Sequence, residues 1–313
     1  MSLPKSDSIP LTVVALATLV ALYFTISGSF AGASAEPIYN FEESNQSELF
    51  DLMDEEFGGF LTPKMSGGWA LQNLEAGRDV FEQQCIHCHG TDGHAKTYTA
   101  KLLTPAPRDF SKGVVKFTST PVGLPATRDD LLRTIKEGVP STSMSRFEGS
   151  IEEQDLQDVA NYAMYLLIRG AVWTDAVALL QEGTAAEAFA AAISEQRQQF
   201  DLALASSTRP EIPDVADSTR GREMYFDKDL GCLVCHQVDA SGGPLDGFDL
   251  WGQPMVARDL QKGELRGGDS PADVYLRIRN GVKGTPMPAM ANELTQEQIW
   301  DLVAFVRSVQ EDN

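Results

Sequence analysis

The chain has 313 residues, of which 42% are hydrophobic and 22% charged, and its formal net charge is -20. This length suits two domains with additional segments, and the composition excludes a largely disordered protein. A surface this acidic repels phosphate backbones, which argues against nucleic acid as a partner; the charge either attracts basic partners or serves solubility alone.

The N-terminal segment is strongly apolar. Residues 11–30 carry no charge, and as a helix they would span about 30 Å, the thickness of a bilayer's hydrocarbon core. A cleaved signal peptide is the alternative, because Ala33-Ser34-Ala35 fits a cleavage site. The apolar run is longer than a usual signal core, and the leader has Asp7 as well as Lys5. We therefore expect residues 1–35 to be a retained transmembrane anchor that delivers the rest of the chain across the membrane.

The chain after this segment contains an internal repeat. An acidic, then glycine-rich extension (36–70) precedes a first repeat (71–170), a linker (171–217) and a second repeat (218–313). From a shared glycine to the closing segment, matching residues of the two repeats are separated by a constant number of positions in the sequence. This indicates one small domain used twice. Examples are Ile135 with Ile278, Gly138 with Gly281, Thr142 with Thr285, Met144 with Met287, and Tyr162 with Phe305.

Helices dominate the expected secondary structure. Each repeat ends in a segment whose apolar residues recur at helical spacing. Thr295 with Gln298 predicts a capping box for the second of these helices, and Ser150 with Glu153 predicts a cap for the first. The linker is rich in alanine, glutamate and glutamine, which favours one or two helices. No stretch alternates long enough to predict a sheet, so the expected fold class is all-α.

All four cysteines lie in two Cys-x-x-Cys-His motifs, the attachment signature of c-type haem. On a helical turn, two cysteines three positions apart reach the vinyl groups on one edge of a porphyrin, and the next histidine offers its imidazole to the iron. A thiol redox pair would need a βαβ context and a zinc site four ligands in a closed shell. We therefore expect two covalently attached, iron-containing haem c groups. The motifs are Cys85, Cys88 and His89 in the first repeat and Cys232, Cys235 and His236 in the second.

The second axial position of each iron is best supplied by methionine. The other two histidines, His87 and His94, lie too near the first motif to reach the far face of its haem. Met287 stands between two prolines that stiffen its loop, and Met144 holds the matching place in the first repeat. Met290 is the alternative for the second haem. We expect Met144 and Met287 to be metal ligands together with the two histidines.

Residues 75–169 and 218–310 resemble class I cytochrome c domains. The resemblance implies a compact fold in which an N-terminal helix, the haem motif, an Ω-like loop and a methionine loop are followed by a C-terminal helix that crosses the first. It further implies that the carbonyl of Pro244, in Gly243-Pro244-Leu245, accepts a hydrogen bond from the ring of His236. The first repeat lacks this segment, which leaves Pro105 as the candidate partner of His89.

Six-coordinate iron has no open position for a substrate, so we expect an electron-transfer protein and not an enzyme. The expected protein is a membrane-anchored dihaem cytochrome c, single-pass in the bacterial inner membrane, with its haem domains in the periplasm. Its expected partners are subunits of a respiratory or photosynthetic membrane oxidoreductase, or a soluble, basic redox protein. Two alternatives remain: the electron-accepting subunit of a periplasmic dehydrogenase or reductase, and a dihaem peroxidase-like enzyme in which Met144 leaves the iron.

Overall fold

The computed structural model describes residues 43–65, 68–180, 183–207 and 209–311. The expected transmembrane anchor therefore lies outside the described residues. Within the described ranges, no helix combines the length and the apolar character that crossing a bilayer requires. Residues Tyr39–Asn313 form one compact unit, which contains both repeats.

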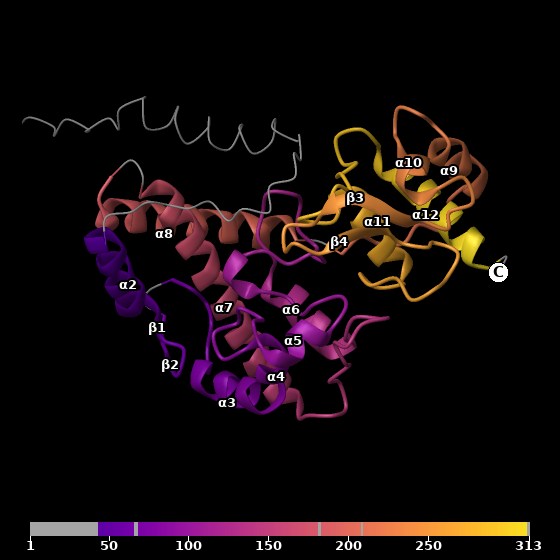
Figure 1. The fold of residues 1–313 in the computed structure, drawn as a ribbon. Coiled ribbons are helices and arrows are strands. Elements are labelled where there is room, and N and C mark those ends of the chain that lie inside the picture. Colours follow the sequence, from indigo (N-terminus) through magenta and orange to yellow (C-terminus); the bar gives the residue numbers. More distant parts are fainter. Residues whose placement is uncertain (1–42, 66–67, 181–182, 208, 312–313) are drawn as a thin grey trace, which may run out of the picture. The chain divides into compact units, whose positions relative to one another are not determined.

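The first repeat is built around two crossing helices (Figure 1). Its N-terminal helix α3 packs on the long helix α7 at Gly77, where a Cβ atom would overlap the carbonyl oxygen of Asp158. Only glycine allows this close approach, which fixes where the helices cross. The elements are α3 (Leu74–Gln84), α4 (Ile86–His89), α5 (Tyr98–Leu102), the 3-10 helix η1 (Phe110–Lys112), α6 (Arg128–Glu137) and α7 (Glu153–Leu179).

The second repeat has the same crossing. Helix α9 packs on α12 at Gly221, where a Cβ atom would overlap the carbonyl oxygen of Asp301. The two crossings occupy matching places in the repeats, as the resemblance implies. The elements are α9 (Ser218–Tyr225), α10 (Cys232–His236), β3 (Gly243–Phe248), β4 (Pro254–Ala257), α11 (Pro271–Asn280) and α12 (Gln296–Glu311).

The extension and the linker join the core of the first repeat. Leu49, Met53 and Phe57 are fully buried on one face of α2 (Glu43–Phe57), which contacts α7 and α8 (Ala185–Ser206). Helix α7 continues into the linker before α8 packs back against it, as Figure 1 shows. Through α2, the acidic extension therefore contributes to a hydrophobic core. A short pair of strands, β1 (Gly58–Gly59) and β2 (Thr62–Pro63), connects α2 to the first repeat.

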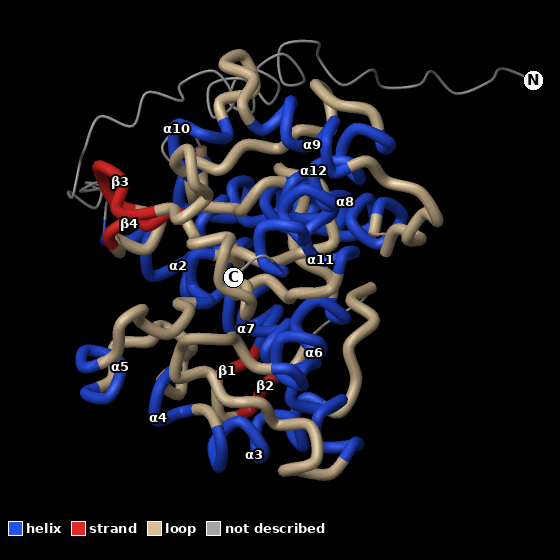
Figure 2. Tube along the Cα trace, turned by 90° about the vertical axis from the view of Figure 1, so that its right-hand side faces the viewer, coloured by secondary structure: helices blue, strands red, loops and turns tan. Residues whose placement is uncertain are grey.

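The described residues are mostly helical, as expected, but the second repeat also contains a β-hairpin that the all-α expectation did not include (Figure 2). Strands β3 and β4 pair antiparallel, with Pro244 opposite Val256 and Phe248 opposite Pro254. The sequence gives little sign of these strands because glycine and proline replace the alternating β-branched residues of ordinary strands. The hairpin turn is held by the Asp249 carboxylate, which accepts hydrogen bonds from the backbone N–H groups of Trp251 and Gln253.

One of the two predicted helix caps is confirmed. The backbone N–H of Thr295 donates to the Gln298 side chain at 2.9 Å, and that of Gln298 donates to the Thr295 hydroxyl at 3.3 Å. The cap predicted from Ser150 and Glu153 is wrong. Helix α7 begins after Glu152 without a side-chain cap, because the Glu153 carboxylate instead accepts a hydrogen bond from Lys136.

Candidate haem sites

The four cysteines lie on or beside the short helices α4 and α10, and none forms a disulfide. Burial raises the pKa of the Cys85 thiol to about 12 and also raises the pKa of Cys232. A catalytic thiol–disulfide centre needs the opposite shift, because the thiolate is its nucleophile. The surroundings of Cys85 and Cys232 therefore argue against thiol redox chemistry.

The two motif histidines are oriented in the same way. The Nδ1 atom of His89 lies 3.0 Å from the carbonyl oxygen of Arg108, and Nδ1 of His236 lies 3.1 Å from that of Arg258. A carbonyl oxygen only accepts hydrogen bonds, so Nδ1 carries the proton and Nε2 keeps a free lone pair for iron. Burial lowers the pKa of both histidines, which further favours the neutral imidazole.

The partner expected for His236 was wrong. Pro244 lies in β3, paired with Val256, and the hairpin brings Arg258, directly after β4, to the histidine ring. In the first repeat Arg108, and not Pro105, has this role. A sequence signal for both was present: Arg108-Asp109-Phe110 is repeated as Arg258-Asp259-Leu260.

The methionine loops of the two repeats share one hydrogen-bonded frame. In each, the residue after a glycine donates its backbone N–H to the methionine carbonyl, and the methionine N–H donates to a threonine hydroxyl two residues earlier. Ser143-Met144-Ser145 thus adopts the frame of Pro286-Met287-Pro288 without its prolines. The distances are 2.9 Å from Val139 to Met144 and 3.1 Å from Met144 to Thr142, and 3.2 Å from Val282 to Met287 and 3.3 Å from Met287 to Thr285.

The second repeat also contains buried donors that fit the two carboxylates of a haem. The Nε1 atom of Trp251 and the Nε atoms of Arg258 and Arg266 are buried without a hydrogen-bond partner among the described residues. Indole and guanidinium groups donate and do not accept, so each calls for an anionic or carbonyl oxygen. A haem would supply reversible one-electron chemistry at its iron, and the histidine orientation, cysteine spacing and unpaired donors all fit it.

Comparison with known families agrees with this geometry. Residues 72–162 match the model of cytochrome c oxidase, cbb3-type, subunit III, and residues 218–310 match that of cytochrome c. The chain is a tandem of two cytochrome c domains. Each domain binds one haem c covalently, through Cys85 and Cys88 in the first cytochrome c domain and through Cys232 and Cys235 in the second.

The chain is also similar to a chain in a solved structure. A chain in the structure titled as the reducing HAO-like protein complex of Kuenenia stuttgartiensis is 28% identical to this dihaem cytochrome, with a TM-score of 0.58. The likeness covers 77% of this chain and 99% of that chain. No curated protein matches the chain.

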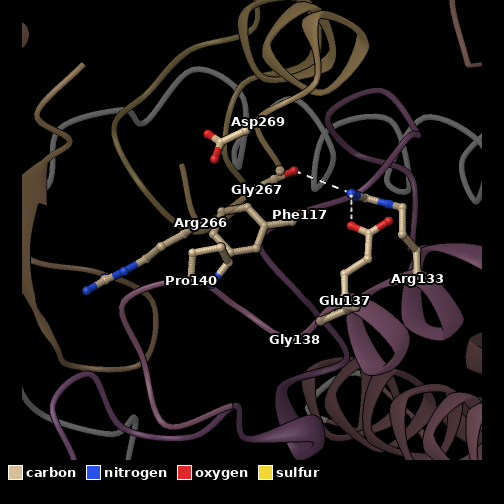
Figure 3. A pocket seen from close by; sticks show the side chains of 10 residues that line it. Phe117, Arg133, Glu137, Gly138, Pro140, Arg266, Gly267 and Asp269 are labelled. Carbon is tan, nitrogen blue, oxygen red and sulfur yellow. Dashed lines mark hydrogen bonds and ion pairs between the residues drawn. The ribbon is translucent and has the colours of Figure 1, made fainter. Parts of the chain in front are cut away.

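The two cytochrome c domains contact each other through charged and polar side chains. Lys116 of the first lies 2.6 Å from Asp249 of the second, and Arg133 lies 3.1 Å from Asp273. Figure 3 shows Arg133 between Glu137 and the Gly267 carbonyl, beside a cavity of about 130 Å³. The methionine loop of the second domain takes part in the contact, because Lys283 donates to the Leu124 carbonyl and, at 2.7 Å, to the Thr120 hydroxyl.

Lys283 makes this contact sensitive to pH. Burial lowers its pKa from 10.5 to about 7, although Asp130 opposes the shift; Arg277 adds to it. Between these two values the unfolded chain holds a proton that the folded chain has released, so stability rises with pH in that window. Below about pH 7 both states are protonated, and the full cost of burying the charge is present.

We expect the free energy of unfolding of the full chain to rise by up to about 1 kcal/mol per pH unit within this window, and Lys283→Met to flatten the rise. Denaturant unfolding at several pH values measures both slopes. The exposed Lys101→Met serves as the matched control and should keep the slope of the unsubstituted chain. Equal slopes in all three proteins would show that Lys283 does not titrate in this range.

Proposed function

We propose that this dihaem cytochrome relays single electrons between redox proteins on the non-cytoplasmic side of a bacterial inner membrane. His89 with Met144, and His236 with Met287, are its axial ligands. The observation that carries the proposal is the shared frame of the two domains: both motif histidines have Nδ1 bound to a carbonyl, and both methionines lie in the same hydrogen-bonded loop.

Methionine ligation suits electron transfer for two reasons. The thioether of each methionine would fill the remaining coordination position of the iron and would leave no place for a substrate. It also favours the reduced iron, and so raises the reduction potential relative to ligation by two histidines. Electron transfer would require no side chain to make or break a bond. The backbone carbonyls of Arg108 and Arg258 orient the imidazoles, and the methionine loops would hold the thioethers.

Replacing each methionine tests the ligand set. We expect Met287→Ala to remove half of the weak far-red absorption band that ferric iron gives with methionine, and to lower the potential of one haem. Met144→Ala should remove the other half. Met290→Ala is the matched control, because Met290 packs partly buried against the core of the same domain. Loss of the band in the control, and its retention in Met287→Ala, would assign the ligand to Met290 instead.

The coordination state of the irons in the unsubstituted protein distinguishes electron transfer from peroxidase chemistry. The first methionine loop keeps its full hydrogen-bonded frame, so both irons should stay six-coordinate and low-spin. We therefore expect no turnover of hydrogen peroxide by the purified chain. A high-spin component that consumes peroxide would instead support an enzyme with an open iron.

The proposed setting is a complex of redox proteins. The similar solved chain comes from a structure titled as a protein complex, and an acidic chain of net charge -20 is suited to steering a basic partner. An anchor at residues 11–30 would hold the domains close to the membrane and its oxidoreductases.

Membrane fractionation tests the anchor. We expect the full chain to stay with membranes washed in high salt and to leave them in detergent, because salt screens charge contacts but does not extract an inserted helix. Release by salt alone would contradict the anchor and favour a cleaved, free protein. Deletion of residues 11–30 from a chain with a substitute cleavable signal should produce the released form.

A further inference from the structure

Arg108 connects its own haem site to the methionine loop of the other domain. Its backbone carbonyl accepts the hydrogen bond from His89, and its guanidinium carbon lies 3.5 Å from the centre of the Trp251 ring. Trp251 in turn packs against Gly284, where an added Cβ atom would lie 2.6 Å from the indole ring. The N–H of Leu250 also donates to the Gly284 carbonyl at 2.9 Å. The guanidinium of Arg108 therefore contacts the loop of Met287 indirectly, through the side chain of Trp251.

Arg258 makes the reverse connection. Its backbone carbonyl accepts the hydrogen bond from His236, while its Nη2 atom donates to the hydroxyl of Ser141 at 3.4 Å. Arg266 reinforces the contact by donating to the Ser141 carbonyl at 3.5 Å. Ser141 belongs to the loop of Met144, so the guanidinium of Arg258 contacts the methionine loop of the first domain.

The two contacted residues are equivalent. Ser141 and Gly284 each lie three positions before the methionine of their loop, and both have left-handed backbone conformations, with φ values of 55° and 71°. Arg258 therefore contacts this position of the opposite loop directly, and Arg108 contacts the equivalent position through Trp251. Because the arrangement occurs in both directions, a chance contact between two surfaces is a poor explanation of it.

We infer that Arg108 and Arg258 are reciprocal positioning residues: each orients the axial histidine of its own domain through its carbonyl and restrains the axial methionine loop of the other domain through its guanidinium. The inference rests on the proposed methionine ligation. Its consequence is that each haem depends on the partner domain for a firmly held thioether. The two domains then act as one electron-transfer unit and not as independent carriers.

Competition by imidazole measures how firmly each methionine is held. The full-length, oxidised protein is labelled with ¹³C at its methionine methyl groups, and imidazole is titrated in. The hyperfine-shifted methyl signal of each ligating methionine disappears as imidazole displaces it. Met144→Leu and Met287→Leu assign the two signals, and they test the proposed ligation separately.

We expect substitution of each arginine to weaken the methionine ligand of the opposite domain. Arg258→Gln should make imidazole displace Met144 at a concentration on the order of tenfold lower, with Met287 unchanged, since one charged contact to the first loop is lost. Arg108→Gln should do the same to Met287 and leave Met144 unchanged. Arg258→Lys, which keeps a cationic donor, should restore part of the resistance at Met144.

Arg222→Gln, at an exposed position of α9, is the matched control and should leave both displacement curves unchanged. An effect of Arg258→Gln confined to Met287, or equal effects on both methionines, would overturn the reciprocal restraint while leaving methionine ligation intact. Absence of one shifted signal from the unsubstituted protein would instead overturn the proposed ligand set.

Discussion

Replacing Cys232 and Cys235 together by alanine is expected to yield a chain that carries one haem where the unsubstituted chain carries two. The two thioethers are the covalent attachment of the second haem, so the mass of the denatured polypeptide should fall by one haem beyond the change in side chains. The second domain should also lose much of its stability, because a domain of this size depends on its cofactor to complete its core. Mass spectrometry of the denatured protein measures the first effect directly.

The matched variant is Cys85→Ala with Cys88→Ala, which should remove the other haem and leave the one at Cys232 and Cys235. Comparison of the two variants assigns an absorption spectrum to each haem. Two haems retained after either double substitution would contradict covalent attachment at that motif.

Gly221→Val is expected to disrupt the second domain through packing alone. A Cβ atom at Gly221 would overlap the backbone of α12 at Asp301, so α9 and α12 must separate and open the core between them. Overpacking of this kind costs about 3 kcal/mol, and backbone cannot move aside as a flexible side chain does. Denaturant unfolding followed by circular dichroism should show an early transition of that domain.

Two further variants show whether the loss of stability comes from the helix crossing. Gly77→Val should produce the corresponding early transition in the first domain, because its Cβ atom meets Asp158 in the same way. Gly263→Val should change the unfolding transition very little, since nothing lies within 4 Å of a Cβ atom there. A stable Gly221→Val protein would mean that the helices cross elsewhere.

The parts of this fold that depend on local sequence could be predicted. The Cys-x-x-Cys-His motifs work within one helical turn, and the methionine loops begin at Gly138 and Gly281, whose φ values of 72° and 67° favour glycine. The constant offset between the repeats then transfers each assignment from one domain to the other. The two domains and their haems follow from these features and are confirmed by the family models.

Contacts that depend on tertiary structure could not be predicted in the same way. Any residue can offer a backbone carbonyl, so the composition of a loop does not reveal that Arg108 or Arg258 will accept from a histidine. The ion pair of Lys116 with Asp249 joins residues far apart in the sequence. Helix α2 is an intermediate case: Leu49, Met53 and Phe57 recur every fourth residue, a helical stripe that could have revealed its buried face.

Two six-coordinate haems that exchange single electrons are expected to give a characteristic redox and magnetic signature. An optical redox titration of the purified full-length protein, combined with electron paramagnetic resonance of the oxidised form, measures this signature. We predict two one-electron steps and two low-spin ferric signals, with the far-red methionine band present until reduction. A colourless protein, a single haem, or a high-spin ferric signal in the unsubstituted chain would contradict the presence of two six-coordinate haems.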